Sequence, residues 1–198
     1  MDEALLYWIN GAWSGPVADH LFTWASARLT FSFPLLLLLL ADSVRRAGGR
    51  GARLWLLLVV SVGIGDATGN AIKSWVGEPR PCFDRHGALV DMGRVPMERC
   101  KGSAGNGMPS NHALNFFIAA TFLTVTTAWR GWQVVIIIAA VLASLSRVYL
   151  GKHLPSQVLA GAAIGVVIGL LTGLWACYHR ASVPPAPGDR FFRDETNG

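Results

Sequence analysis

Basic and imidazole side chains stand at the borders of the apolar runs in this sequence: Lys73 and Arg80 close one run, His112 begins the next, and Arg147 and His153 flank the end of another. Guanidinium groups bind two oxygens of an anion at once and an ammonium group adds a point charge, so this set suits a phosphate group. Two imidazoles beside a phosphate favour covalent catalysis, in which one attacks phosphorus while the other protonates the leaving oxygen and then activates water. The residue types therefore predict phosphoryl chemistry.

The stretch "MPSNHALN" adds a second way of binding an anion. Pro109 and Ser110 precede an apolar helix, which leaves free the backbone N–H groups near Ser110, Asn111 and His112. Such helix N-termini bind anions through these donors and the helix dipole. A plain N-cap role for Ser110 is the alternative. The sequence shows no cluster of carboxylates to hold Mg²⁺, so we expect the chemistry to need no metal ion or other cofactor.

Apolar segments must position these residues. The 198-residue chain is 52% hydrophobic and has a mean hydropathy of +0.40. A soluble helical protein would rarely contain a run such as "FPLLLLLLA" without a polar face. We therefore predict an all-α, polytopic membrane bundle of about five to six helices with an outward-facing active site. Its apolar blocks are long enough to cross about 30 Å of hydrocarbon: they are Leu29–Val44, Leu54–Val76, Ala113–Trp129, Trp132–Leu150 and Val158–Tyr178.

The positive charges between the blocks predict the orientation. Short connections rich in Lys and Arg remain cytoplasmic. Such residues occur in alternate connections, namely Arg45, Arg46, Arg50, Arg53, Arg130, His179, Arg180, Arg190 and Arg193. The N-terminus, the 77–111 loop and the link around His153 then share the outer face. We expect a multi-pass protein of the inner (cytoplasmic) membrane, with its site facing the periplasm or exterior.

We expect residues 1–180 to form a single membrane domain, followed by a flexible cytoplasmic tail, 181–198, that is rich in Pro and Gly. Residues 1–28 are interpreted as an interfacial segment with Trp8 and Trp13 at headgroup depth, the alternative being a partly ordered terminus. The net charge of +5 is not arranged as a basic stripe, so we expect no nucleic-acid partner. The oligomeric state is not predicted.

Three motifs in the order "KSWVGEPRP", "PSNH" and "SRVYLGKH" resemble those of the type-2 phosphatidic acid phosphatase superfamily, which includes bacterial lipid phosphatases and soluble vanadium haloperoxidases. The resemblance implies a metal-independent phosphatase with a helical membrane core, whose partners are the bilayer and a phosphorylated lipid such as phosphatidate, phosphatidylglycerol phosphate or undecaprenyl pyrophosphate. It also implies roles: Lys73, Arg80 and Arg147 bind phosphate, Ser110 and its neighbouring backbone complete the cradle, His112 is the general acid, and His153 is the nucleophile.

The sequence departs from the family pattern at two positions. Asn111 replaces a Gly, and Gln157 replaces the Asp expected four residues after His153. That Asp would accept the Nδ1–H of the nucleophile and stabilise positive charge on its ring; a Gln can do only the first. In a Ser-His-Asp enzyme, replacing the Asp with Asn cost about 10⁴ in kcat. Gln157 therefore indicates a slow enzyme, a different supporting residue, or an engineered inactive variant.

A candidate supporting residue is Asp66. It shares a helix face with Asn70 and Lys73, because the three are spaced i, i+4 and i+7. A carboxylate at this depth needs a partner. The alternatives are that Asp66 pairs with a buried cation or hydroxyl, or that it reaches His153.

Cys82 and Cys100 fall in the outer loop, where an oxidising environment would let them pair. We predict a disulfide between them, with two free thiols as the alternative. Cys177 lies toward the other face and is expected to be reduced.

Three other functions remain open from the sequence. A lipid phosphotransferase would use the same phospho-histidine, and a low-activity or non-catalytic lipid-phosphate binder would keep the cations. A structural membrane protein with interfacial charges would not explain the ordered spacing of the motifs.

Overall fold

The computed structural model describes residues 1–84 and 105–181. Within these ranges the chain contains seven α-helices and no β-strand, apart from one isolated bridge between Pro79 and Asn106. The predicted all-α class is therefore confirmed, with more short helices than expected. The helices are α1 (Asp2–Ala12), α2 (Pro16–Ala25), α3 (Phe33–Val76), α4 (Pro81–Asp84), α7 (Asn111–Thr126), α8 (Arg130–Tyr149) and α9 (Pro155–Ala181), with a π-helical turn at Arg28–Ser32 before α3.

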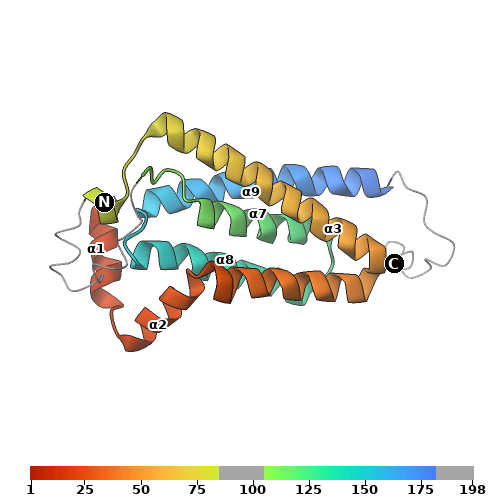
Figure 1. Ribbon diagram of the computed structural model, residues 1–198, viewed down its shortest axis with the longest axis horizontal. Helices are drawn as coiled ribbons and strands as arrows, with labels where there is room; N and C mark the ends of the chain where they lie inside the picture. Colours follow the sequence, from red (N-terminus) through yellow and green to blue (C-terminus); the bar gives the residue numbers. More distant parts are fainter. Residues whose placement is uncertain (85–104, 182–198) are drawn as a thin grey trace, which may run out of the picture.

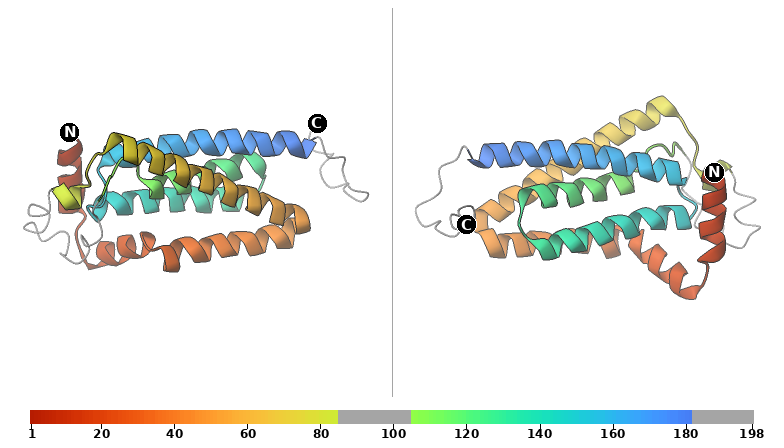
Figure 2. Two further views of the ribbon diagram at one scale, coloured as in Figure 1. Left: turned by 45° about the horizontal axis from the view of Figure 1, so that its top comes forward. Right: turned by 180° about the vertical axis from the view of Figure 1, so that it is seen from behind.

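Helix α3 folds back on itself and supplies two antiparallel arms of the bundle (Figures 1 and 2). The bend is at Gly48, whose φ of 52° and ψ of −130° are non-helical. A straight helix of 44 residues would be about 66 Å long, more than twice the hydrocarbon thickness. The sequence predicted two helices joined by an arginine-rich loop. The arginine-rich segment is instead helical on both sides of the bend, because Arg and Ala favour helix and only glycine takes this φ easily.

Three helical segments are long and apolar enough to cross a membrane: Arg28–Val76, Arg130–Tyr149 and Pro155–His179. The first contains both arms of α3. The expected block Ala113–Trp129 is shorter in the structure, because α7 ends at Thr126 after 16 residues. This arrangement of long apolar helices indicates a multi-pass membrane protein.

Helix α7 is held between glycine-lined faces of α9 and α3. A Cβ added at any of these glycines would come within 2.3–3.1 Å of an atom of α7 or of its N-cap Ser110, so no larger residue fits without movement. Small residues allow this close approach of helices in membranes, where dispersion contacts rather than the hydrophobic effect favour packing. The stripe on α9 has a four-residue spacing that the sequence analysis did not use: Gly161, Gly165, Gly169 and Gly173, with Gly65 and Gly69 on α3.

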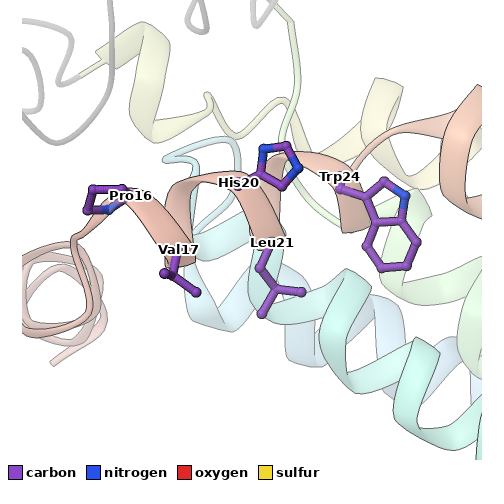
Figure 3. Close-up of a pocket in the computed structure, with 5 residues that line it drawn as sticks. All are labelled: Pro16, Val17, His20, Leu21 and Trp24. Carbon is purple, nitrogen blue, oxygen red and sulfur yellow. The ribbon is translucent and has the colours of Figure 1, made fainter.

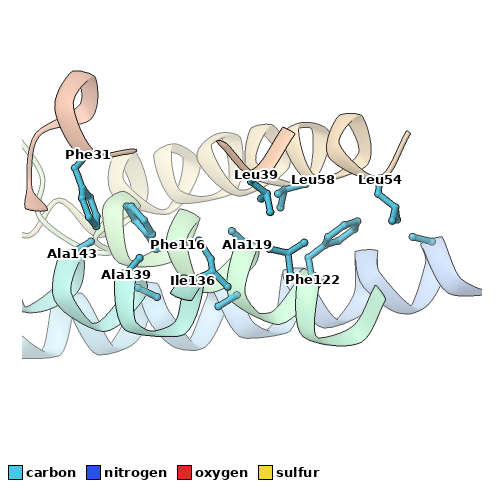
Figure 4. Close-up of a cluster of buried hydrophobic side chains, with 14 residues drawn as sticks. Phe31, Leu39, Leu54, Leu58, Phe116, Ala119, Phe122, Ile136, Ala139 and Ala143 are labelled. Carbon is cyan, nitrogen blue, oxygen red and sulfur yellow. The ribbon is translucent and has the colours of Figure 1, made fainter. Parts of the chain in front are cut away.

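The apolar core of the bundle lies among α3, α7, α8 and α9 (Figure 4). Phe116 of α7 stacks on Phe31, with ring centroids 5.8 Å apart, and Phe122 and Leu58 are fully buried in the same cluster. This core fixes the helices relative to one another. It therefore also fixes the connections at their ends, where the chemistry-bearing residues lie.

The two ends of the bundle differ. Helix α1 lies across one end, roughly perpendicular to α8 and α9 (Figure 1), and its own Leu6 and Ile9 are buried. Asn10 Nδ2 donates to the carbonyl of Val148 (3.2 Å). The segment before the π-helical turn therefore consists of two helices, α1 and α2.

The other end carries the bend of α3 and the start of α8. Trp132 Nε1 donates to Asp42 (2.6 Å), and the guanidinium of Arg46 lies 5.9 Å from the ring of Trp129. The arginines near the bend and Arg130 therefore gather at one end of the molecule, opposite the end that α1 covers.

Candidate active site

Four connections meet beneath α1. They are the end of α3, the turn that follows it, the approach to α7, and the link between α8 and α9. Helix α3 ends where Gly77 adopts a left-handed conformation (φ 68°), which leaves Lys73 in its last turn. Hydrogen bonds join the connections in pairs: Asn106 Nδ2 to Lys73 O (2.6 Å), Gly107 N to Glu78 O (2.6 Å), Cys82 N to Gly151 O (3.0 Å) and Ser110 N to Gln157 O (2.9 Å).

His153 lies in the link between α8 and α9 and is 2% exposed. Its backbone N–H donates to the carbonyl of Arg147 (3.1 Å), which ties the ring's position to the end of α8. Burial, followed by the positive charges of Arg147 and Arg80, holds the pKa of His153 well below its usual value. The ring is therefore neutral near pH 7, as a nitrogen nucleophile must be.

Gln157 is fully buried and contacts the nucleophile candidate directly. Its Oε1 lies 3.2 Å from His153 Nδ1 and accepts the backbone N–H of Leu154 (3.2 Å). An amide oxygen only accepts, so this contact requires a proton on Nδ1 and leaves the lone pair on Nε2. Nε2 has no hydrogen-bond partner in the part of the chain that the structure describes. Gln157 thus favours the Nδ1–H tautomer of His153, which is the role expected of an Asp at this position.

His112, in the first turn of α7, is oriented by a residue that the sequence analysis missed. The backbone of Ser26 favours the charged form of this ring, but burial and the charge of Arg147 outweigh it and lower the pKa of His112 to about 3. The Oγ of the same serine accepts a hydrogen bond from an Nη of Arg147 (2.5 Å). Ser26 follows α2 and belongs to no motif, so only the folding of the N-terminal segment onto α8 reveals its role.

Six buried side-chain polar atoms lack a partner within residues 1–84 and 105–181, and three of them belong to the motif residues: Ser110 Oγ, His112 Nε2 and Arg147 Nε. Buried polar groups are nearly always paired, so unpaired ones need an explanation such as an absent ligand. A serine hydroxyl, an imidazole nitrogen and a guanidinium N–H are all able to donate to oxygen. The three atoms are therefore suited to a phosphate group.

Arg80 follows α3 and is half-buried. Its Nε donates to the carbonyl of Asn106 (3.4 Å), and its other guanidinium N–H groups donate to no residue that the structure describes and can bind another acceptor. Burial lowers the pKa of Arg80, but a guanidinium still remains charged. A partly desolvated cation beside His153 favours the binding of an anion.

Lys73 is joined to Asp66 through Asn111. Its Nζ donates to the carbonyl of Pro109 and to Asn111 Oδ1 (2.5 Å). Asn111 Nδ2 donates in turn to Asp66 Oδ1 (3.1 Å) and to Asn70 Oδ1 (3.0 Å). Asn111, which departs from the family pattern, therefore links Lys73 to the two polar side chains that share its face of α3.

Asp66 forms hydrogen bonds with amides. Its Oδ1 accepts from Asn111 and from Asn115 (2.9 Å), and it has no hydrogen bond with His153. The idea that Asp66 replaces the missing carboxylate at the nucleophile is thus not supported by the structure. Asp66 forms no direct hydrogen bond with a cation or hydroxyl among the described residues, but its charge acts on Lys73, to which it is connected through the Asn111 amide.

Cys82 is disulfide-bonded and buried, whereas Cys177 is free. Cys100, the expected partner of Cys82, lies outside the described residues, as do much of the 77–111 loop and nearly all of the 181–198 tail. The pairing with Cys100 stays a prediction.

A hollow on α2 is separate from these residues. It is lined by Pro16, Val17, His20, Leu21 and Trp24 (Figure 3), and none of the residues that the motifs predicted contributes to it. Val17, Leu21 and Trp24 are exposed. Exposed apolar and aromatic side chains on a short helix suit the lipid interface rather than a phosphate site.

The sequence of residues 54–181 matches the PAP2 superfamily. This match covers more than half of the chain and contains all three motifs. The chain belongs to the PAP2 superfamily. The resemblance read from the motifs is therefore confirmed, and the PAP2 match includes both α8 and α9 with the link that carries His153.

Relatives of this PAP2 protein are named lipid phosphatases. "Lipid phosphate phosphatase delta" of Arabidopsis thaliana is 33% identical over 64% of this chain and 30% of its own length. "Lipid A 1-phosphatase" of Porphyromonas gingivalis is 29% identical over 78% of this chain and 29% of its own length. The chain thus spans less than a third of these two relatives.

Two crystal structures have the same fold. The crystal structure of Aquifex aeolicus LpxE matches with a TM-score of 0.62 at 20% sequence identity, and the match covers 86% of this chain and 93% of the LpxE chain. That of a transmembrane PAP2-type phosphatidylglycerolphosphate phosphatase from Bacillus subtilis has a TM-score of 0.62 at 21% identity, covering 92% and 88%.

Proposed function

We propose that this PAP2 protein hydrolyses a lipid phosphate or pyrophosphate through a phospho-histidine, without a metal ion. The observation that carries the proposal is the set of buried, unpaired polar atoms on Ser110, His112 and Arg147 beside a neutral His153. The lipid phosphatase names of the relatives support a lipid as the carrier of the phosphate.

In the first step, Nε2 of His153 attacks phosphorus and a P–N bond forms as the P–O bond to the lipid breaks. Burial and the charge of Arg147 lower the pKa of His112 to about 3, so its ring takes up a proton only when the phosphate anion is bound beside it; it then donates that proton to the leaving lipid oxygen and becomes neutral. Arg80, Arg147 and Lys73 stabilise the charge on the equatorial oxygens of the transferring group.

In the second step, neutral His112 takes a proton from water, whose oxygen attacks phosphorus. The P–N bond breaks, its electron pair returns to Nε2, and inorganic phosphate leaves. Gln157 holds the proton on His153 Nδ1 through both steps, so the same tautomer is restored.

The arrangement of the ends supports an outer site. The candidate residues lie at the end that α1 covers, and the arginines of the α3 bend lie at the opposite end. If the arginine-rich end is cytoplasmic, the site faces the periplasm or exterior. A phosphatidate-, phosphatidylglycerol-phosphate- or undecaprenyl-pyrophosphate-type lipid would present its phosphate there while its tails stay in the bilayer.

The test is phosphate release from these lipids, and from lipid A, in mixed micelles containing EDTA. We expect turnover in the presence of the chelator, loss to background in His153→Ala and in His112→Ala, and retention in His20→Ala, which removes an exposed histidine of α2. Radioactive phosphate trapped on the wild type should be acid-labile and stable in alkali. Full turnover in His153→Ala, or no turnover on any of these lipids, would refute the proposal.

A further inference from the structure

The amide of Gln157 connects His153 to a carboxylate on another part of the chain. Gln157 Oε1 lies 3.2 Å from His153 Nδ1, and Gln157 Nε2 donates to Glu78 Oε1 (3.0 Å) and to the carbonyl of Pro79 (3.1 Å). Glu78 stands in the turn after α3, within "KSWVGEPRP", and is 79 residues from Gln157. The three side chains form one continuous path from the imidazole to the carboxylate.

The chemistry of the neighbours fixes the direction of this path. The backbone N–H of Leu154 can only donate, and it donates to Gln157 Oε1 (3.2 Å). The carbonyl of Pro79 can only accept, and it accepts from Nε2. Turning the amide over would place donor against donor and acceptor against acceptor. The oxygen of Gln157 therefore faces His153 and its nitrogen faces Glu78.

The surroundings are shaped for this long amide. Gly107 N donates to the carbonyl of Glu78 (2.6 Å), which holds the approach to α7 against the turn after α3. A Cβ on Gly107 would lie 2.4–2.7 Å from the amide atoms of Gln157. The approach to α7 therefore leaves room for Gln157 to span the distance between Glu78 and His153.

We propose that Glu78 is a positioning residue that supplies, through the Gln157 amide, the negative charge that the nucleophile lacks at position 157. The inference rests on the proposed function, since it assumes that His153 carries the phosphoryl group. As the P–N bond forms, the ring gains positive charge. The Glu78 carboxylate polarises the amide to which it is hydrogen-bonded, and the amide oxygen then holds the Nδ1–H more strongly.

The size of the effect follows from the path. Two hydrogen bonds, of 3.2 and 3.0 Å, and one amide separate the carboxylate from the ring. The path is about 8 Å long, and at an effective dielectric of about 20 a charge at that distance changes an equilibrium constant about 30-fold. Only part of the charge has developed in the transition state, so we expect Glu78→Gln to lower kcat by about 10- to 30-fold. KM should change little, because Glu78 does not bind the phosphate.

A pH profile separates charge from structure. Without the Glu78 charge, the cations that face His153, namely Arg147 from α8, Arg80 from the turn after α3 and Lys73 from α3, are less opposed. Protonation of the ring becomes harder, so the acidic limb of kcat/KM should move to lower pH in Glu78→Gln. Glu78→Asp, which keeps the charge, should recover part of kcat. Glu3→Gln, which removes the charge of an exposed side chain of α1, is the matched control and should leave kcat and the acidic limb unchanged.

Moving the carboxylate gives a second test that does not depend on Glu78→Gln alone. In Gln157→Asp the shorter side chain puts two carboxylates near each other without the bridging N–H, so kcat should fall. In the double variant Glu78→Gln/Gln157→Asp the single charge contacts His153 directly, and kcat should recover relative to Gln157→Asp.

Two results would overturn the inference. One is a Glu78→Gln enzyme with wild-type kcat and an unmoved acidic limb; the other is a Gln157→Asp enzyme faster than wild type. Either leaves the proposed function intact as long as His153→Ala is inactive and wild type turns over, so the two failures are distinguishable.

Discussion

Gly107→Ala tests whether the position of the Gln157 amide controls the nucleophile. The added Cβ would lie 2.4 Å from Gln157 Oε1, about 1 Å short of ordinary van der Waals contact. Backbone atoms carry this Cβ, so the amide must move. A displacement of about 1 Å would stretch the 3.2 Å contact with His153 Nδ1 beyond hydrogen-bonding range. Misplacement on this scale costs about 100-fold, so we expect kcat to fall by about that factor.

The assay is phosphate release over a range of lipid concentrations, together with a thermal melt in detergent. Overpacking of this kind costs about 1–3 kcal/mol, so the variant should still be folded at the assay temperature. Gly63→Ala is the control, because a Cβ there meets no atom within 4 Å and neither kcat nor the melt should change. A folded Gly107→Ala enzyme with kcat within about twofold of wild type would refute the reasoning.

Three further predictions concern pH, phosphate binding and packing. The lowered pKa of His153 keeps the attacking ring neutral, so kcat/KM should not decrease as the pH falls through 6.5; an acidic limb at or above 6.5 would contradict this. Asp66→Asn should raise KM by about 5- to 10-fold with a smaller change in kcat, because it weakens the hold of Asp66 on the Asn111 amide that contacts Lys73. A large fall in kcat with an unchanged KM would instead place Asp66 at the reacting atoms. Gly165→Val should lower the melting temperature, because its Cβ would lie 2.4 Å from a backbone carbonyl of α7, whereas Gly63→Val should not; equal melts would exclude tight packing of α9 on α7.

The residue types and their order predicted which side chains meet, because the motifs stand at helix ends and alternate connections must share a face. The bend in α3 could not be predicted, since the arginine-rich segment has good helix propensity and one glycine suffices to reverse the chain. The glycine stripe of α9 was readable from its four-residue spacing.

The two departures from the family pattern were visible in the sequence, but their meaning was not. The partners of Gln157 and Asn111 come from the turn after α3 and from α3 itself, up to 79 residues away. Ser26 reaches Arg147 across 121 residues. Periodicity and motif spacing describe neighbours along one helix, so contacts of this kind require the folded chain.

The docking of α1 has a practical consequence for handling the protein. Asp2 accepts hydrogen bonds from the backbone N–H (2.9 Å) and hydroxyl (2.5 Å) of Ser156, in the first turn of the helix that carries Gln157. A purification tag joined before Met1 would emerge one residue from this contact, above the candidate site. Affinity handles and reporter fusions therefore belong beyond Ala181, at the far end of the bundle, where they leave the active end undisturbed.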